Sequence, residues 1–359
     1  MRAAQHKYEA RTLLALVIAA WLGSALPSAF ATDCPGVDAV PVTLNADYQN
    51  GERFQGVRLR GAVRLADRRV NDQAVQGLSG LAWSPIRQRL LALSDLGSVM
   101  ELEPRFHDDM LVGARVCVAH ALQDEHGRPL AGRARDAEGL SLRPRTGAAD
   151  EELLVSFEQQ PRVVRYALDG HWLATLPLPN PLANSARYRD PNRALEALTE
   201  TRRFGVIVAP ELPLARDTGT AVPLVSLGGP SFQFRTMDAQ YSGVVGMETL
   251  PDDNLLVLER RYISPFRPLI IALSRVTLPE RAGAPAKQTE IARFDTTAGW
   301  AMDNFESVAR HHGNRYFMIS DDNASALQQT LLFYFEILDE AAPASTAKPP
   351  AAPLSRHRL

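Results

Sequence analysis

One short pattern occurs five times in the chain, and this internal repeat constrains the fold more than any other feature. Each copy has a short apolar segment, a polar turn, and a second apolar segment that an acidic residue closes. The copies begin about 50 to 60 residues apart. They are "SGLAWSPIRQRLLALSDLG" from Ser79, "EGLSLRP" with "ELLVSFEQ" from Glu138, "EALTETRRFGVIVAPE" from Glu196, "METLPDDNLLVLERRY" from Met247 and "FESVARHHGNRYFMISDDN" from Phe305.

Further apolar runs complete each unit. "RVVRYAL" (162–168) and "WLATLPL" (172–178) follow the second copy, and Pro and Gly punctuate the turns. Four strands per repeat predict an all-β fold, namely a β-propeller of four-stranded blades. Five copies favour five blades, and one degenerate blade hidden in a linker would make six.

The two ends of the repeat region predict how the ring closes. The last copy has a third strand, Thr330–Leu338, but no fourth, whereas Gly56–Ala66 precedes the first copy without a unit of its own. Pairing these two segments removes both exposed edges. We therefore expect a propeller domain over residues 56–338, preceded by an extension (32–55) and followed by an Ala/Pro-rich tail (339–359) without fixed structure.

The N-terminus has the layout of a secretory signal peptide. Basic residues precede the apolar run Leu13–Leu22, and small residues lead up to Ala31. The run is shorter than the roughly 20 residues that span a bilayer, so we expect no stable membrane anchor. Residues 1–31 are predicted to direct export to the periplasm or the medium, with cleavage after Ala31.

Composition and charge narrow the class of partner. The chain is 45% hydrophobic and 22% charged, which suits a large buried core. Loss of residues 1–31 changes the formal net charge from −2 to about −4. We therefore expect no nucleic-acid partner, and instead a monomer that takes a small-molecule ligand.

Both cysteines, Cys34 and Cys117, remain after cleavage and would meet an oxidising compartment. A disulfide between them is the predicted state. The alternative is a pair of buried thiols.

Acidic residues recur at both ends of the repeated hairpin. In an antiparallel hairpin, the start of one strand and the end of the next lie at the same end of the sheet. Glu138 and Glu158 should therefore lie at one mouth of a central channel. The same register predicts that further carboxylates join them, namely Glu196 and Glu211, Glu248 and Glu259, Glu306 and Asp321, and Asp95.

Converging carboxylates repel one another, so some are protonated or cations lie among them. Arginines near the motifs supply internal counter-charges, namely Arg135, Arg189, Arg193, Arg260 and Arg261. The remaining acids suit a hard cation with oxygen ligands, Ca²⁺ first and Mg²⁺ second. The alternative is that the acids only end the strands and keep this face soluble.

The motifs as a set resemble the phytase-like domain family, described as esterase-like activity of phytase. They are "GLSGLAWSP" with "LLALSDLG", "DAEGLSL", "NRALEAL", "LLVLERRY" and "DNFESVA" with "MISDDN", and they cover about Gly56 to Leu338. The resemblance implies a bacterial, exported β-propeller hydrolase. Three copies depart from the motif, because Ala197, Thr249 and Ser307 stand where glycine usually follows the acid.

Two chemistries are open for such a ring. A serine esterase needs a nucleophile with a histidine base, but the chain lacks a Gly-x-Ser-x-Gly elbow, and Ser79 is the one serine that the repeat places at the mouth. Metal-assisted phosphoester hydrolysis fits the acids better. Its candidate catalytic residues are Glu138, Glu158 and Glu196, and its candidate phosphate-binding residues are Arg193 and Arg260.

A different class of function stays open beside hydrolysis. The propeller could be a non-catalytic binding module with structural Ca²⁺, or it could act on lactones. The two arginines would then balance the acidic ring.

Overall fold

The computed structural model describes residues 34, 37–66, 68–147, 150–180, 182–217, 219–280, 285–325 and 327–338. The expected signal peptide and tail lie outside these residues. The chain divides into Met1–Cys34 and Pro35–Leu359, and the fold is that of the second unit. Within the described ranges it contains no α-helix, only 3-10 turns at Gly132–Ala134, Ser185–Arg187 and Thr296–Ala298.

No helix in the described part of the chain has the length and apolar character needed to cross a bilayer.

Three sheets each consist of four antiparallel strands that are consecutive in the sequence. Their strands are β10 (Ala137–Pro144), β11 (Glu151–Phe157), β12 (Arg162–Ala167) and β13 (Trp172–Leu176); β14 (Leu195–Thr201), β15 (Gly205–Pro210), β16 (Ala221–Ser226) and β17 (Ser231–Arg235); and β18 (Ser242–Thr249), β19 (Leu255–Arg261), β20 (Ile270–Thr277) and β21 (Lys287–Asp295).

A ten-stranded sheet contains the remaining copies of the repeat, in the order β22-β23-β24-β3-β1-β9-β8-β7-β6, with β2 attached to β3. Its strands are β1 (Val37–Val42), β2 (Arg53–Phe54), β3 (Val57–Leu65), β6 (Leu78–Ser84), β7 (Arg89–Ser94), β8 (Ser98–His107), β9 (Met110–Ala121), β22 (Asn304–His312), β23 (Arg315–Asp321) and β24 (Leu331–Ile337). A small ribbon pairs β4 (Arg69–Val70) with β5 (Gln73–Ala74).

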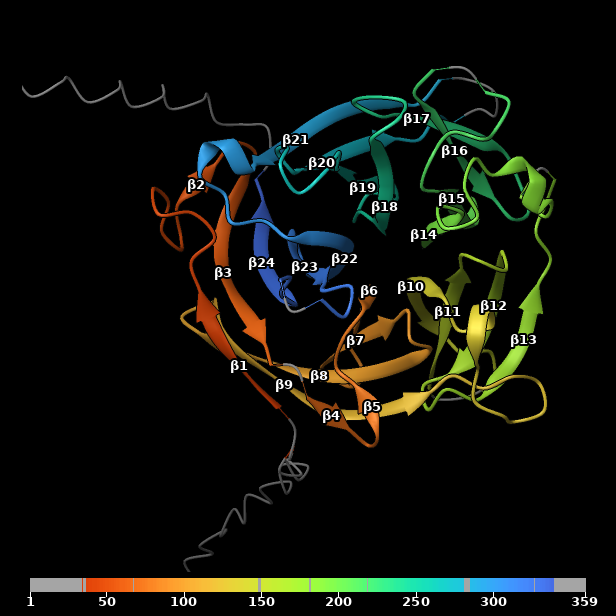
Figure 1. Ribbon diagram of the computed structural model, residues 1–359, viewed down its shortest axis with the longest axis horizontal. Coiled ribbons are helices and arrows are strands. Elements are labelled where there is room, and N and C mark those ends of the chain that lie inside the picture. Colours follow the sequence, from red (N-terminus) through yellow and green to blue (C-terminus); the bar gives the residue numbers. More distant parts are fainter. Residues whose placement is uncertain are drawn as a thin grey trace, which may run out of the picture. The chain divides into compact units, whose positions relative to one another are not determined.

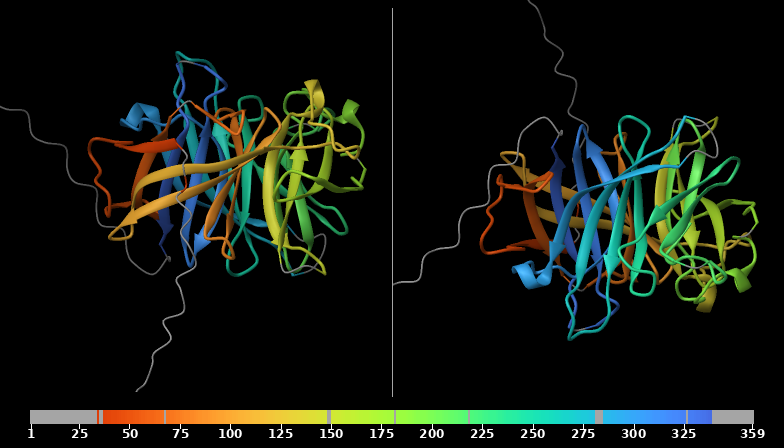
Figure 2. Two further views of the ribbon diagram at one scale, coloured as in Figure 1. Left: turned by 90° about the horizontal axis from the view of Figure 1, so that it is seen from below. Right: turned by 90° about the horizontal axis from the view of Figure 1, so that it is seen from above.

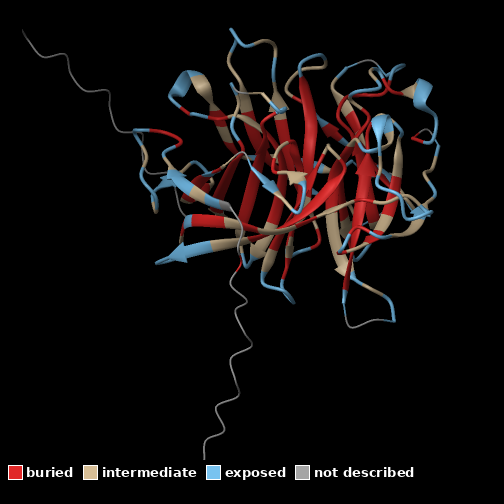
Figure 3. Ribbon diagram, turned by 60° about the horizontal axis from the view of Figure 1, so that its bottom comes forward, coloured by how far each residue is buried: buried red, intermediate tan, exposed pale blue. Residues whose placement is uncertain are grey.

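The sheets stand around a common centre, as the expected β-propeller requires (Figure 1). Among the described residues, the innermost strands β6, β10, β14, β18 and β22 contact one another in a closed cycle. The apolar cores lie between neighbouring sheets, where Leu154 of β11, for example, belongs to the same buried cluster as Val208 of β15. Figure 3 shows the buried residues concentrated in these inner strands. The prediction of an all-β propeller is confirmed.

The predicted closure by an N-terminal strand is also confirmed. Strand β3 pairs antiparallel with β24, with Val63 opposite Leu332, and so supplies the fourth strand that the last copy lacks. Strand β1 was expected only as part of an extension, yet it pairs with both β3 and β9. It thereby joins the β22–β3 half to the β6–β9 half in one continuous sheet. In this structure both Cys34 and Cys117 are disulfide-bonded.

Each innermost strand carries an irregularity in its pairing at the same place. The register shifts at residue 79 in β6, at 138–139 in β10, at 196 in β14, at 245 in β18 and at 306 in β22. Such a β-bulge turns a side chain out of the regular alternation. A Cβ added to Gly139, next to the bulge, would lie 2.9 Å from the carbonyl oxygen of Glu196 on the neighbouring strand. Glycine there allows two inner strands to approach closely.

We expect the closure to be required for folding. Deletion of residues 32–66 removes β1, β2 and β3 and exposes the edge of β24, an apolar strand that would pair with other chains. The shortened protein should aggregate, as size-exclusion chromatography would detect. The matched control is deletion of residues 341–359, which belong to no described strand and should leave the melting temperature unchanged. A monomeric, cooperatively melting 32–66 deletion would contradict the requirement.

Candidate functional site

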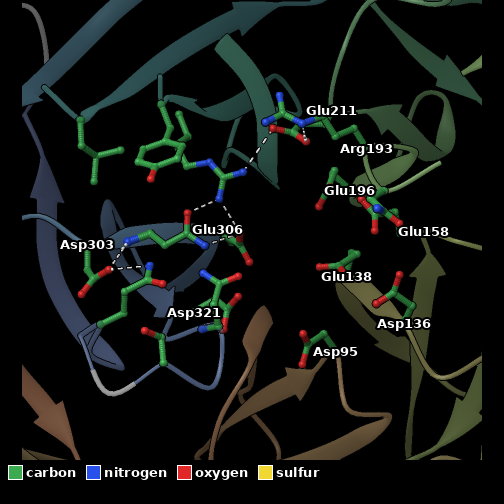
Figure 4. Close-up of a pocket in the computed structure, with 18 of the residues that line it drawn as sticks. Asp95, Asp136, Glu138, Glu158, Arg193, Glu196, Glu211, Asp303, Glu306 and Asp321 are labelled. Carbon is green, nitrogen blue, oxygen red and sulfur yellow. Dashed lines mark hydrogen bonds and ion pairs between the residues drawn. The ribbon is translucent and has the colours of Figure 1, made fainter. Parts of the chain in front are cut away.

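A cavity of about 880 Å³ opens at the end of the channel where β10 begins. Two guanidinium groups, Arg193 and Arg260, line it together with nine carboxylates, a formal excess of seven negative charges when all are ionised. The carboxylates are Asp95, Asp136, Glu138, Glu158, Glu196, Glu211, Asp303, Glu306 and Asp321. Figure 4 shows these side chains directed toward a common space.

The repeat places these acids in two tiers. Glu138, Glu196 and Glu306 occupy the bulge position of their inner strands, which directs them into the channel. The second tier lies at the end of the neighbouring strand and consists of Asp95, Glu158 and Glu211, each directly after the last paired residue, and of Asp321, which is the last paired residue. Seven of the nine predicted metal-site acids therefore meet at one mouth.

The β18–β21 sheet departs from the pattern. Its bulge falls at Val245, and Arg260 pairs opposite Gly243, the place where the other sheets have an acid. The fourth copy of the repeat therefore begins three residues earlier than the sequence pattern indicated. Its glycine is Gly246, so Thr249 is not a departure from the motif.

Glu248 and Glu259 were expected at the mouth, and the structure does not place them there. Glu248 lies near the far end of β18 and interacts with the backbone N–H of Arg310, and desolvation raises its pKa to about 7. Glu259 lies one residue before the mouth position and accepts a hydrogen bond of 2.6 Å from the backbone N–H of Met237. Neither carboxylate lines the cavity. Glu248 lies three residues after the bulge at Val245, and Glu259 lies one residue before Arg260, which takes the mouth position.

Three carboxylates on one side of the cavity share hydrogen bonds. Burial, and then the charge of Glu196, raise the pKa of Glu158, which hydrogen-bonds to both Glu196 and Asp136. Burial, followed by the charge of Glu211, raises the pKa of Glu196 to about 8. A hydrogen bond between two carboxyl groups needs a proton, so the hydrogen-bonded carboxyl groups of Asp136, Glu158 and Glu196 hold protons when no cation is bound.

Glu138 lies beside these three carboxyl groups but has no hydrogen-bond or ion-pair partner among the described residues. It is 8% exposed, and among the described residues nothing donates a hydrogen bond or forms an ion pair with its carboxylate (Figure 4). Burial and the charges of Glu196 and Glu306 raise its pKa well above the usual range. Oxygen atoms of Asp136, Glu138 and Glu158 lie within 4.8 Å of one another. Asp136 Oδ2 and Asp95 Oδ1 are also buried without a hydrogen-bond partner in the described residues.

The two arginines differ in how firmly they are held. Arg260 donates to Glu306 Oε1 at 2.5 Å and to Glu211 Oε1 at 3.2 Å, and its side chain is 13% exposed. Burial lowers its pKa, but the charges of Glu306 and Glu211 outweigh burial and leave that pKa raised. Arg193 lies 3.6 Å from Glu211 Oε2 and is 29% exposed. Arg260 is therefore a fixed counter-charge, whereas Arg193 can reach a ligand.

The charge of Arg135 partly offsets the burial that raises the pKa of Asp95 at the cavity, whereas the other two arginines expected as counter-charges act elsewhere. Arg261 pairs with Asp238 at 3.0 Å, and Arg189 donates to backbone carbonyls. Sequence reasoning missed Asp136 and Asp303, which line the cavity. The signal was present, because each stands two or three residues before a bulge glutamate.

A propeller with a carboxylate-lined mouth is the class that fold and site define. The Phytase-like family model, described as esterase-like activity of phytase, matches residues 73–324. The chain therefore belongs to this family. No curated protein matches.

Solved structures with similar backbones include the β-propeller domain of Cps50 (Swd1) from Myceliophteria thermophila, at 12% identity and a TM-score of 0.38, which covers 83% of this chain and 99% of that one. A glucose dehydrogenase is similar at 13% identity and a TM-score of 0.34, with 83% and 96% covered.

The raised pKa values predict how stability depends on pH in a chelator. Desolvation raises the pKa of Asp95 from 3.8 to about 7, and Glu196 reaches about 8. Between these values and the unfolded ones, the folded state keeps protons that the unfolded chain releases, so stability falls as pH rises. The melting temperature should fall by about 5 °C or more between pH 5 and 8. Glu196→Gln should flatten this fall, and a melting temperature that rises with pH in chelator would contradict it.

Matched variants should separate the two arginines. Arg260→Met removes a buried cation that two glutamates need, and should cost about 3–5 kcal/mol of unfolding free energy. Arg193→Met removes a partly exposed group and should cost less than about 1 kcal/mol. Urea unfolding of both variants in chelator measures the difference. Equal losses would show that Arg193 is as structural as Arg260.

Proposed function

We propose that the protein is a hydrolase that acts on phosphoesters at the acidic mouth, with a divalent cation held by Asp136, Glu138 and Glu158. The observation that carries this proposal is the unpartnered Glu138 beside carboxylate oxygens within 4.8 Å. Ca²⁺ takes six to eight oxygen ligands at about 2.4 Å, so oxygens on opposite sides of the ion lie about 4.8 Å apart. The donor set is oxygen only, which suits Ca²⁺ first and Mg²⁺ second.

The charge balance favours a cation over protons alone. Arg260 is committed to Glu211 and Glu306, so in the described part of the chain no cationic side chain that lines the cavity forms an ion pair with Asp136, Glu138 or Glu158. Two neighbouring like charges repel each other by roughly 1 kcal/mol in water. In a partly buried space the repulsion energy is several times larger. A bound divalent ion would relieve this repulsion, neutralise a phosphate and lower the pKa of water.

The protein's own residues would divide the remaining work. Arg193 is exposed enough to bind a phosphate oxygen of the substrate. Glu196 lines the cavity beside Glu158, to which it hydrogen-bonds, so its carboxyl group is placed to accept a proton from water and to donate it to the leaving oxygen. Water then adds to phosphorus as the ester bond breaks, and the proton passes to the alcohol that leaves.

The site offers less to a serine mechanism. Ser79 donates its hydroxyl to the carbonyl of Ala137 and does not line the cavity. No described histidine lines the cavity either. Membership of the Phytase-like family supports hydrolysis as the general class. Export to the periplasm or medium, where Ca²⁺ is abundant, agrees with the proposal and stays a prediction.

Glutamine variants test the proposal. Glu138→Gln and Glu158→Gln keep the shape of each side chain but remove one negative charge. Turnover of p-nitrophenyl phosphate or an inositol phosphate in Ca²⁺ should fall about a hundredfold or more. The shift of the melting temperature by Ca²⁺ should shrink as well, from a stabilisation of about 2.7 kcal/mol at hundredfold excess over Kd.

Glu259→Gln is the matched control, because this carboxylate is as buried but lies outside the cavity. It should change neither turnover nor the Ca²⁺ shift. Ca²⁺ stabilisation without turnover of any phosphoester, ester or lactone would instead favour a binding module with structural Ca²⁺. Full turnover in both Glu138→Gln and Glu158→Gln would exclude these acids from catalysis.

A further inference from the structure

One side of the cavity carries five apolar side chains among polar ones. Tyr262, Pro265 and Leu269 come from the loop between β19 and β20, Met302 precedes β22, and Leu327 lies in the loop between β23 and β24. We call these five residues the apolar lip. Both loops leave the strands at the mouth end, and in Figure 2 the blue and teal loops stand out from one side of the ring.

The lip exposes large apolar side chains to water. Leu327 lines the cavity and is 95% exposed, and Tyr262 is 41% exposed. Phe266, next to Pro265 in the same loop, is 96% exposed. Single exposed apolar residues are common, but a group of them at the entrance of a cavity is typical of a binding surface.

The lip lies across the channel from the carboxylates that form no ion pair with another described residue. Asp136, Glu138 and Glu158 belong to the β10–β13 sheet, whereas the lip belongs to the β18–β21 sheet and the β22–β3 half. Strand β10 contacts β6 and β14 in the inner cycle, and β18 and β22 lie beyond them. A ligand that touches both walls must therefore span the mouth.

The size of the cavity agrees with such a ligand. Its volume of about 880 Å³ lies near the upper end of the roughly 300–1,000 Å³ that drug-sized ligands occupy. A phosphate group alone would leave most of it to water. The space beyond the acids is large enough for an organic group.

We propose that the substrate is an amphiphilic phosphoester, an alkyl or aryl phosphate whose phosphate lies at the acids and Arg193 and whose apolar group lies on the lip. The proposal rests on the function proposed for the same cavity and names its substrate class. Leu327 carries the argument, because one side chain both lines the cavity and stands almost wholly in water. Covering it with the apolar group of a ligand removes that exposed surface.

Isothermal titration with ethyl phosphate and octyl phosphate tests the lip. Both probes are used in saturating Ca²⁺ and below the concentration at which octyl phosphate forms micelles. Partial burial of six extra methylenes should make octyl phosphate bind about tenfold more tightly or better. Leu327→Ser and Tyr262→Ser should each reduce this preference without lowering the affinity for ethyl phosphate.

Ile86→Ser is the matched control. Ile86 is 63% exposed and lies in the turn between β6 and β7, at the end of the sheet away from the mouth. This variant should keep the full preference for octyl phosphate. Melting temperatures of all three variants check that the fold persists.

Equal affinity for the two phosphates, or binding of neither, overturns the amphiphilic substrate. A preference that both lip variants retain overturns the role of the lip. Co-sedimentation with phosphatidylcholine vesicles gives a further arm: if Leu327→Ser lowers vesicle binding but keeps the octyl preference, the lip contacts a lipid surface instead, and the proposal fails. Turnover without a preference for octyl phosphate contradicts only the role of the apolar lip. A preference that depends on the lip, without any turnover, contradicts only the proposed hydrolase activity.

Discussion

The pairing of β3 with β24 is the constraint on which the rest of the structure depends. A propeller blade is stable only when each of its faces packs on a neighbour, so an open ring would leave apolar faces and a strand edge in water. Strand β3 supplies the missing edge with residues that are buried on folding, including Val57 and Val63. Strand β1 adds a second connection, to β9, so that two neighbouring sheets share one continuous set of backbone hydrogen bonds. The channel therefore keeps its shape without help from the ligand.

A rigid ring can hold groups that repel one another. The bulge of each inner strand fixes the direction of its side chain, and three of the five inner strands then aim a glutamate at one mouth. Burial raises the pKa of Glu138 and Glu306, which means that the fold holds them where their charged forms are disfavoured. The clusters of apolar residues between the sheets supply the free energy that offsets this cost. Crowded carboxyl groups of this kind are typical of functional sites, because they can bind a cation or, when protonated, donate a proton.

The fold could be predicted from the sequence because the repeat determines it. Each unit has four strands, the last copy lacks its fourth strand, and one N-terminal strand belongs to no unit. Most of the site was readable for the same reason, since strand register places Glu138 and Glu158 at one end. The fourth copy misled, because Glu248 resembles the motif acid while the true bulge residue is the apolar Val245. The last three copies share a spacing that indicates the true register, because Glu196 and Glu211, Val245 and Arg260, and Glu306 and Asp321 stand 15 residues apart. The split between Arg193 and Arg260 depends on side-chain burial, which no linear pattern records.

The irregular fourth copy also makes one side of the mouth different from the other. A ring of equal copies would place acids evenly around the channel and would offer a ligand no preferred orientation. Val245 and Arg260 stand where two acids would be expected, and Arg260 adds a cation that forms ion pairs with Glu211 and Glu306. The unneutralised acids are then concentrated around Glu138, on the opposite wall. The loop that follows Arg260 carries Tyr262 and Leu269, so the side that loses its acids is also the side that gains an apolar surface. One departure from the repeat thus makes the two sides of the mouth unlike, with unpaired carboxylates around Glu138 and apolar side chains opposite them, and a ligand with two unlike ends would favour one orientation.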